Sequence, residues 1–394
     1  MKKLLSIIVL VGLILVGSGP AGAGQLWGTG SPDWSYGSSG PSAVIFKFDT
    51  SSGVVSSGSF SFETSNWMWI SGLADSGGKY LYASHNSYDT AESPNTHDFK
   101  IAKIDRNTGA VLSDTFISGF LGQTYSQVNA LDFVNGKLYG VENATSGSAI
   151  RGYAIEVLLD AAGDVVGATK GAYVGPYPDA GLDYHDGLWY ATSWGYTPPP
   201  KKQGSIVYTS PDIMNVPFTK VGTGNSAVQG IGMIDGWEFD SDGNLFAVTW
   251  YGVPASATAV YSIDLSTRQA TVLYDLSSQL PASIISLDGL SEIAPDTDGD
   301  GVPDSIDNCG SSDLRPKVDV NGDEPGTTTI NNTVNTQGCS LQDFVNSCAS
   351  GASNHGQYVS CISGLAHQLY NSGAITKSQR QEMITGAAKS NIGK

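Results

Sequence analysis

The stretch Gly181-Leu-Asp-Tyr-His-Asp-Gly-Leu-Trp-Tyr-Ala-Thr-Ser-Trp194 contains the pattern that decides the fold. A Gly-Leu-acid-aromatic phrase leads into a glycine turn, and the turn is followed by Leu, an aromatic residue and small residues. Short apolar runs separated by turn residues are typical of β-strands. The stretch therefore predicts two consecutive strands with a tight connection.

Both halves of this stretch recur along the chain. The Leu-aromatic half begins at Leu26, Leu81, Leu138, Leu188 and Leu245, at spacings of 55, 57, 50 and 57 residues. The Gly-Leu half begins at Gly72, Ala130, Gly181, Gly236 and Gly289. A third phrase follows the Leu-aromatic half and is clearest at 45–54, 101–110 and 260–267. In it, apolar and polar residues alternate up to an Asp-containing turn, which predicts a hairpin.

Four strands in each unit of 50 to 57 residues are the anatomy of a β-propeller blade. We therefore predict a mainly β protein with a five-bladed propeller over residues 24–294. Its last Gly-Leu phrase has no partner after it and its first Leu-aromatic phrase has none before it, so both ends should complete one blade. A pair of β-sandwiches is the alternative architecture.

Residues 296–309 read Asp-Thr-Asp-Gly-Asp-Gly-Val-Pro-Asp-Ser-Ile-Asp-Asn-Cys. A calcium loop needs acidic side chains at alternate early positions, a glycine at position 6, a carbonyl at position 7 and a closing carboxylate at position 12. An acidic, solvated linker is the alternative. The predicted Ca²⁺ ligands are Asp296, Asp298, Asp300, Val302 through its carbonyl, Asp304 and Asp307.

This motif resembles the thrombospondin type 3 repeat and the related linkers of OmpA-like outer-membrane proteins, over residues 296–339. The resemblance implies that Cys309 pairs with Cys339. Gly310 departs from the family, because a proline usually follows the cysteine. A second, partial set of acidic and amide residues suggests a possible second metal site at Asp319, Asn321 and Asp323, although Glu324 replaces the glycine.

The first 23 residues predict a signal peptide, with two lysines, an apolar run and a small-residue cleavage site. Apart from this run no segment is apolar enough to span a bilayer, so no integral membrane span should remain after cleavage. The formal net charge of −17 argues against nucleic acid as a partner. We expect a secreted or periplasmic protein.

All four cysteines lie between 309 and 361, and an even number in an exported protein suggests two disulfides. We assign residues 295–339 to a calcium-binding linker and residues 340–394 to a small helical module. Helical periodicity and capping boxes predict helices at about 341–350, 355–371 and 377–388. Cys348 and Cys361 fall on facing helices and should pair.

Acidic residues recur at equivalent positions of the predicted blades, at Asp132, Asp183, Glu238, Asp235 and Asp288. One interpretation places them at the channel mouth, where they bind a cation or a polyhydroxylated ligand. The alternative is that they cap turns or bond neighbouring blades. Seven aromatic residues form a second group, either for sugar stacking or for core packing: Trp67, Trp69, Trp189, Trp194, Trp237, Trp250 and Tyr251.

No hydrolase elbow, zinc motif or phosphate loop is present in the sequence. We therefore expect a non-catalytic calcium-binding protein whose propeller binds a glycan, a small molecule or an envelope or extracellular protein, as in adhesion. The alternative is a propeller enzyme of lactonase or glycosidase type that uses the channel carboxylates.

Overall fold

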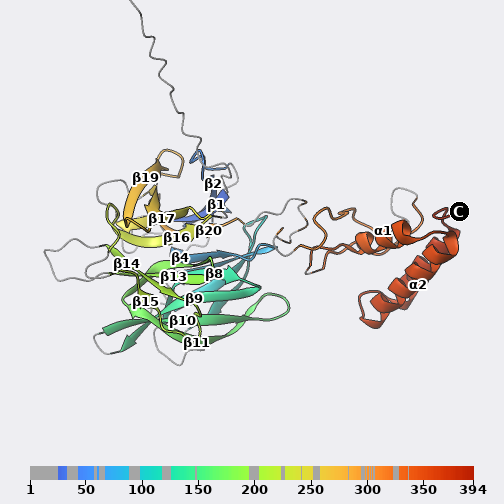
Figure 1. Ribbon diagram of the computed structural model, residues 1–394, viewed down its shortest axis with the longest axis horizontal. Coiled ribbons are helices and arrows are strands. Elements are labelled where there is room, and N and C mark those ends of the chain that lie inside the picture. Colours follow the sequence, from blue (N-terminus) through green and yellow to red (C-terminus); the bar gives the residue numbers. More distant parts are fainter. Residues whose placement is uncertain are drawn as a thin grey trace, which may run out of the picture.

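The computed structural model describes residues 25–32, 43–56, 60–61, 67–87, 98–117, 126–146, 149–194, 204–222, 227–240, 242–251, 258–282, 284–293, 307–322, 328–335 and 337–394, and the single residues 298, 300, 302 and 304. The predicted signal peptide lies outside them. The described residues form twenty strands and three helices. The strands make a ring of sheets, and the helices lie to one side of that ring (Figure 1).

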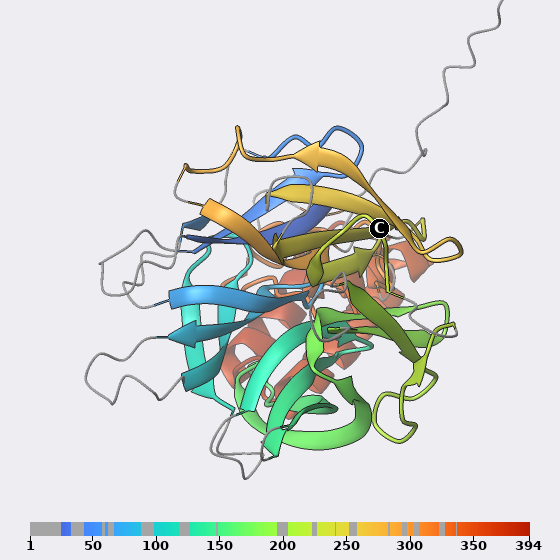
Figure 2. The ribbon, with the colours of Figure 1, turned by 90° about the vertical axis from the view of Figure 1, so that its left-hand side faces the viewer.

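Five antiparallel sheets of four strands each form the ring, and we number them as blades 1 to 5 (Figure 2). Blade 1 consists of β20 (Ile284–Glu292), β1 (Gln25–Pro32), β2 (Val44–Asp49) and β3 (Phe60–Ser61). Blade 2 consists of β4 (Trp67–Asp75), β5 (Tyr80–Ser87), β6 (Asp98–Asp105) and β7 (Val111–Phe116). Blade 3 consists of β8 (Ser126–Val134), β9 (Lys137–Ser146), β10 (Ala149–Leu159) and β11 (Val165–Pro176). Blade 4 consists of β12 (Pro178–His185), β13 (Leu188–Trp194), β14 (Ser205–Ser210) and β15 (Thr219–Lys220). Blade 5 consists of β16 (Met233–Phe239), β17 (Leu245–Tyr251), β18 (Ala259–Asp264) and β19 (Gln269–Asp275).

The predicted five-bladed propeller is confirmed, including its closure. β20 pairs antiparallel with β1, with Leu26 opposite Glu292 and Gly28 opposite Leu290. The C-terminal strand of the ring therefore completes the blade that the N-terminal strand begins. Because both ends of the domain share one sheet, the ring is held closed by backbone hydrogen bonds and needs no disulfide.

Apolar side chains fill the spaces between blades. Trp27, Ile45 and Leu73 belong to one buried cluster of blades 1 and 2, and Trp237 belongs to a cluster of blades 4 and 5. Trp189 is buried as well, which favours core packing over sugar stacking for these two tryptophans. The side chains of the other five aromatic residues in that predicted group lie outside the described part of the structure.

The glycines that open the Gly-Leu phrases of β4 and β16 let neighbouring innermost strands approach closely. A Cβ on Gly236 of β16 would lie 2.8 Å from Gly289 Cα and 2.8 Å from the Leu290 nitrogen of β20. A Cβ on Gly72 of β4 would lie 2.8 Å from the Leu131 nitrogen of β8. Backbone atoms cannot move aside as a flexible side chain can, so these positions are restricted to the smallest residues.

The helices are α1 (Leu341–Gly351), α2 (His355–Asn371) and α3 (Lys377–Lys389), as the sequence predicts to within one residue. Both predicted capping boxes form, at Ser340 with Asp343 and at Thr376 with Gln379. Both predicted disulfides are present: Cys309–Cys339 and Cys348–Cys361, with Cα–Cα distances of 5.0 and 5.6 Å. None of the described helices is both long and apolar enough to cross a bilayer.

The boundary that we placed at residue 340 runs through a shared hydrophobic core. Val318, Val320 and Ile330 from the predicted linker pack in one buried cluster with Tyr358 of α2 and Met383 of α3. Three short helices alone have little apolar surface to bury, and the preceding segment supplies the missing part. The described residues between 307 and 394 thus form one packed unit, which we call the C-terminal unit.

Replacing Gly236 by Ala tests the close approach of β16 and β20. We expect Gly236→Ala to lower the free energy of unfolding of the propeller by about 1–3 kcal/mol, because the added Cβ forces two backbones apart. Gly175→Ala is the matched control, since its nearest neighbours would lie at an ordinary 3.5 Å. Thermal and urea denaturation measure both, and equal stability of the two variants would refute this account.

Candidate functional site

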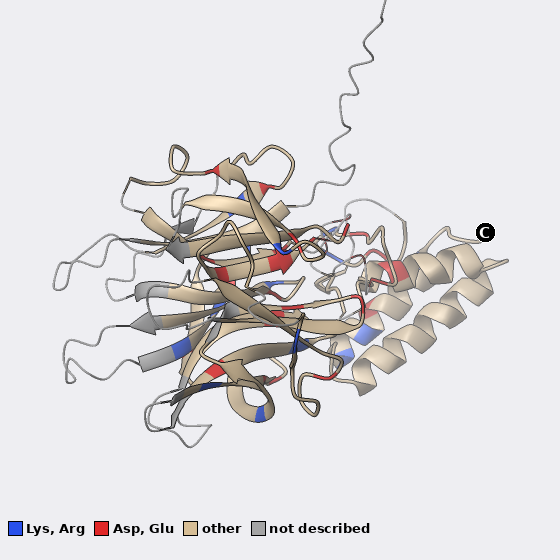
Figure 3. Cartoon of the chain, turned by 60° about the vertical axis from the view of Figure 1, so that its left-hand side comes forward, with Lys and Arg blue, Asp and Glu red and all other residues tan. Residues whose placement is uncertain are grey.

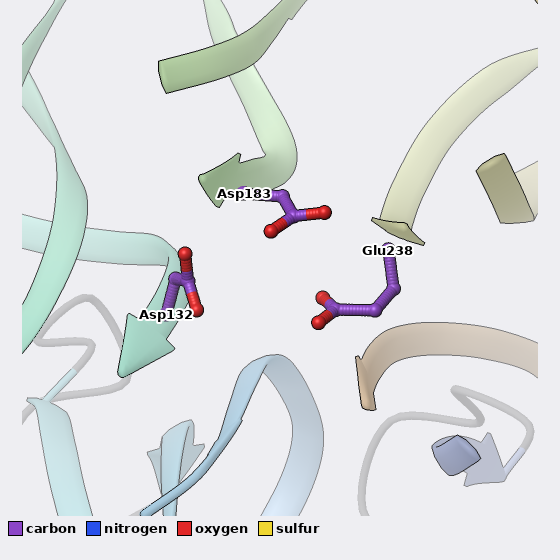
Figure 4. Close-up of side chains that lie close together, drawn as sticks. All are labelled: Asp132, Asp183 and Glu238. Atoms are coloured by element: carbon purple, nitrogen blue, oxygen red, sulfur yellow. The ribbon is translucent and has the colours of Figure 1, made fainter. Parts of the chain in front are cut away.

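Three acidic residues from consecutive blades converge at the centre of the ring (Figure 4). Asp132 of β8, Asp183 of β12 and Glu238 of β16 hold the same place in their Gly-Leu phrases. Each offers one carboxylate oxygen, and these three oxygens lie within 4.8 Å of one another. We call this group the channel cluster.

Each member of the channel cluster accepts a backbone hydrogen bond from the next blade around the ring. The Tyr184 N–H donates to Asp132 Oδ2 at 3.0 Å, and the Phe239 N–H donates to Asp183 Oδ2 at 2.6 Å. The Glu292 N–H donates to Glu238 Oε1 at 3.0 Å. The interpretation in which these acids bond neighbouring blades therefore describes what the structure shows, and the same bonds bring the carboxylates together.

The remaining two blade junctions carry no acid at this position. Ser291 of β20 uses its hydroxyl to accept the Asp75 N–H at 2.9 Å. Ala74 of β4 has no side-chain acceptor for the N–H of Phe133 in β8. Acids at this position of the innermost strands therefore come from blades 3, 4 and 5 alone.

Burial makes ionisation of the channel cluster unfavourable. Asp183 and Glu238 are only 4% and 7% exposed, and Asp132 is half-buried. Burial raises the pKa of Asp132 to about 7, with a further contribution from Glu292. Burial also raises the pKa values of Asp183 and Glu238, and the neighbouring cluster carboxylates raise them further. None of the ion pairs among the described residues involves these three acids.

The other two acids predicted at the channel mouth lie apart from this cluster. Asp288 of β20 is buried and accepts hydrogen bonds from the hydroxyls of Ser31 and Ser286. Burial raises the pKa of Asp288 to about 7. Asp235 is half-buried on β16 and does not belong to the group of converging carboxylates. Their matching sequence positions therefore do not place them with Asp132.

A second convergence of carboxylates lies in the predicted calcium loop, in the acidic segment between ring and helices (Figure 3). Asp298, Asp300 and Asp307 each offer one oxygen, and these oxygens lie within 4.8 Å of one another. Among the other predicted ligands, Asp304 is exposed and outside this group, and Asp296 lies outside the described residues. The Val302 N–H donates to Asp300 Oδ1 at 2.8 Å.

Backbone groups hold these three carboxylates in place. The Ser312 N–H donates to Asp298 Oδ2 at 2.6 Å, and the Cys309 N–H donates to Asp307 Oδ1 at 2.6 Å. Asp307 Oδ2 is buried and accepts no hydrogen bond from any described residue. Burial raises the pKa of Asp300, and Asp298 and Asp307 contribute in the same direction. An all-oxygen donor set with one orphaned buried oxygen fits a hard divalent cation.

Two contacts of this loop escaped the sequence prediction. Gly338 packs directly on Asp307, and a Cβ there would overlap the carboxylate. The Ser312 hydroxyl donates to the Gly338 carbonyl, and Cys339 follows in the disulfide to Cys309. A lone glycine before a cysteine carries no sequence signal for such a contact. Through it, the loop is joined to the C-terminal unit.

At the possible second metal site, the first residue, Asp319, is engaged by backbone N–H groups and by an arginine. Asp319 is buried, and its Oδ1 accepts the Asn321 N–H at 3.0 Å and the Gly322 N–H at 3.1 Å. Its Oδ2 lies 3.5 Å from the Arg315 guanidinium, which already supplies a positive charge. Asp323 lies outside the described residues, and no group of converging acids among the described residues includes Asp319.

Neither a family model nor a curated protein matches the chain. Solved structures with some similarity include the Hadza microbial sialidase Hz136, at 8% identity and a TM-score of 0.43 over 64% of this chain and 55% of that one. Sucrose-6-phosphate hydrolase from Lactobacillus gasseri matches at 14% identity and a TM-score of 0.36, over 52% of this chain and 47% of that one. An endo-1,4-beta-xylanase from Bacteroides thetaiotaomicron matches at 11% identity and a TM-score of 0.35, over 61% of this chain and 81% of that one. This chain thus spans about half the length of the first two, and similarity at this level assigns no function.

The buried acids make the stability of the propeller depend on pH. Folded-state pKa values of about 7 at Asp132 and Asp288 lie above the usual value near 3.9, so the folded state binds protons more tightly than the unfolded chain. The contribution of these two acids to the free energy of unfolding is therefore fully present at low pH. It is lost between about pH 4 and pH 7, by up to about 1.4 kcal/mol per pH unit for each group.

We accordingly expect the melting temperature of the full chain in chelator to fall between about pH 4 and pH 7. Asp288→Asn should reduce this slope, because an amide of the same shape cannot ionise. Asp264→Asn, in an exposed turn, should leave the slope as it is. Calorimetry at several pH values measures all three proteins, and a melting temperature that rises over this range would contradict the assignment.

Proposed function

We propose that this chain is an exported calcium-binding protein whose propeller presents a ligand-binding surface, in adhesion or another interaction at the cell envelope or outside the cell. One observation carries the calcium assignment. Oxygens of Asp298, Asp300 and Asp307 converge within 4.8 Å, and the buried Asp307 Oδ2 accepts no hydrogen bond from the described residues. Without a cation, the three carboxylates would repel one another.

Calcium suits this donor set better than a transition metal does. Carboxylate oxygens are hard ligands, and the group contains no imidazole or thiolate, which zinc and copper prefer. The resemblance to the thrombospondin type 3 repeat points to the same ion. The bound ion would neutralise the loop and stiffen the connection between the ring and the C-terminal unit.

Export is consistent with this assignment. All four cysteines are paired and none is free, as in proteins of oxidising compartments. Extracellular calcium modules bind at about 0.1–1 mM, a concentration that is reached outside the cytoplasm. A secreted or periplasmic location therefore provides both the calcium and the disulfides.

Substituting one ligand tests the calcium site. We expect the full chain to bind Ca²⁺ with a dissociation constant of about 0.1–1 mM, and Asp307→Asn to weaken binding about tenfold, because it removes one charge from the donor set. Isothermal calorimetry measures both. Asp264→Asn, an exposed acid of the propeller, should bind as the natural chain does. Absence of binding at millimolar calcium, or equal binding by Asp307→Asn, would rule out the site.

The propeller offers an exposed aromatic ring to a polyhydroxylated ligand. Tyr184 of β12 is 37% exposed and packs on Trp189 with ring centroids 5.1 Å apart. Such a ring presents the apolar face on which a sugar can stack. The alternative of a propeller hydrolase has one observation in its favour, the pKa of about 7 at Asp132, which suits a general acid at neutral pH.

A glycan array with the full chain tests the propeller ligand. We expect Tyr184→Ala to lose binding at least about fivefold, because the stacking ring is removed, whereas Tyr173→Ala keeps it. Tyr173 is a matched control, since it is 38% exposed on the outermost strand of blade 3. An equal loss in both variants would refute a site at Tyr184. Turnover of chromogenic glycosides or lactones that disappears in Asp132→Asn would instead support the enzyme.

A further inference from the structure

We propose that the calcium loop is coupled to the first turn of α1, so that calcium binding and the capping of this helix stabilise each other. This inference rests on the proposed calcium site and gives it a regulatory consequence. Two series of contacts lead from converging carboxylates of the loop to the two residues of the α1 capping box, Ser340 and Asp343. Neither of these residues belongs to the group of converging oxygens.

The first series passes through two consecutive backbone N–H groups. The Ser312 N–H donates to Asp298 Oδ2 at 2.6 Å, and the next N–H, that of Asp313, donates to Asp343 Oδ1 at 2.9 Å. Asp298 is one of the three converging carboxylates, and Asp343 is the third residue of α1. Only the two backbone dihedrals of Ser312 separate these N–H groups, because each peptide unit is planar. A displacement of Asp298 therefore shifts the donor that Asp343 binds.

The second series passes through Gly338. This glycine packs on Asp307, another converging carboxylate, so closely that a Cβ would overlap its Oδ1 atom. Cys339 follows and forms the disulfide to Cys309, whose N–H donates to Asp307 Oδ1 at 2.6 Å. The next residue is Ser340, the N-cap of α1. The segment that places the N-cap is thus held against a carboxylate of the loop.

The capping box joins the ends of the two series. Asp343 Oδ2 accepts the Ser340 N–H at 2.7 Å, and the Ser340 hydroxyl accepts the Asp343 N–H at 3.1 Å. The Asp343 carboxylate therefore accepts one N–H from its own cap and another from the loop side. A capping box holds the first turn of a helix by satisfying backbone N–H groups that have no partner within the helix. Here the same carboxylate also fixes the position of the loop.

Calcium binding provides the free energy for this coupling. Without a cation, the three carboxylates within 4.8 Å repel one another, and Asp298 and Asp307 are less restrained. Ser312 and Gly338, which contact these two acids, then hold the capping box less firmly. Coupling between two sites is reciprocal, so a change that loosens the capping box must weaken calcium binding by the same factor.

The capping box of α3 offers a matched comparison. Gln379 Oε1 accepts the Thr376 N–H at 2.9 Å, as Asp343 does for the N-cap of α1. Within the part of the chain that the structure describes, no hydrogen bond joins this second box to the calcium loop. The two helices therefore begin in the same way, and only one of them is connected to the converging carboxylates.

Calorimetric titration of the full chain with Ca²⁺ tests the coupling. We expect Asp343→Ala to weaken binding about fivefold or more, although it removes no ligand. Gln379→Ala, at the same position of the α3 capping box, should bind within about twofold of the natural chain. Glu382→Ala should do so as well. It controls for the lost charge, because it also removes a carboxylate that accepts two hydrogen bonds, both from Thr329.

Hydrogen–deuterium exchange of the natural chain provides a second measurement should Asp343→Ala fold poorly. With free Ca²⁺ at about ten times the dissociation constant, exchange in peptides covering 310–315 and 340–346 should slow about tenfold, because opening there must release the ion. Peptides covering 376–382 should change by less than about twofold.

The outcomes separate this coupling from the calcium site itself. Calcium binding that is equal in the natural chain and Asp343→Ala, or equally weak in Asp343→Ala and Glu382→Ala, would overturn the coupling and leave the site in place. Equal protection of both capping boxes by calcium would do the same. Absence of binding by the natural chain would instead remove the site, and the coupling with it.

Discussion

The unpaired edges of the innermost strands are the constraint on which this structure depends. Each innermost strand has a neighbour in its own sheet on one side only, and its other edge faces the ring, where buried backbone N–H groups still need acceptors. Side chains from the preceding blade supply them at four of the five junctions, through three carboxylates and one hydroxyl. The acceptors that bind one blade to the next also gather negative charge at the centre, so stability of the ring and its sensitivity to pH have one origin.

The C-terminal unit likewise depends on residues that lie outside its helices. Its core needs Val318, Val320 and Ile330 from the segment before the helices, and the disulfide Cys309–Cys339 joins that segment to the start of α1. Gly338 and Ser312 connect the acidic loop to this arrangement. The loop is therefore held on its C-terminal side by a packed unit and, through β20, on its N-terminal side by the ring. This placement suits a structural ion at the connection between two folded parts.

Much of the architecture could be predicted because each repeat of the sequence phrases corresponds to one blade. The spacing of Gly-Leu and Leu-aromatic phrases predicts five blades and their closure, and both are confirmed. Capping boxes and the positions of Cys348 and Cys361 predict the helices and their disulfide equally well. The boundary at residue 340 was less well predicted, because short alternating runs such as Lys317-Val-Asp-Val320 do not reveal which surface they cover.

For the candidate sites, the sequence alone determined which residue types stand at equivalent positions, and it identified Asp132, Asp183 and Glu238 as well as the acidic loop. Only the tertiary structure decided which of these acids meet. Asp235 and Asp288 also stand on innermost strands but do not belong to the cluster, whereas Glu292, which no motif singled out, is bonded to it. The physical reason is that a strand position specifies the direction of a side chain within its own blade. The distance between two carboxylates depends on how closely the backbones of neighbouring blades approach, and that is decided by glycines and acceptors elsewhere in the ring.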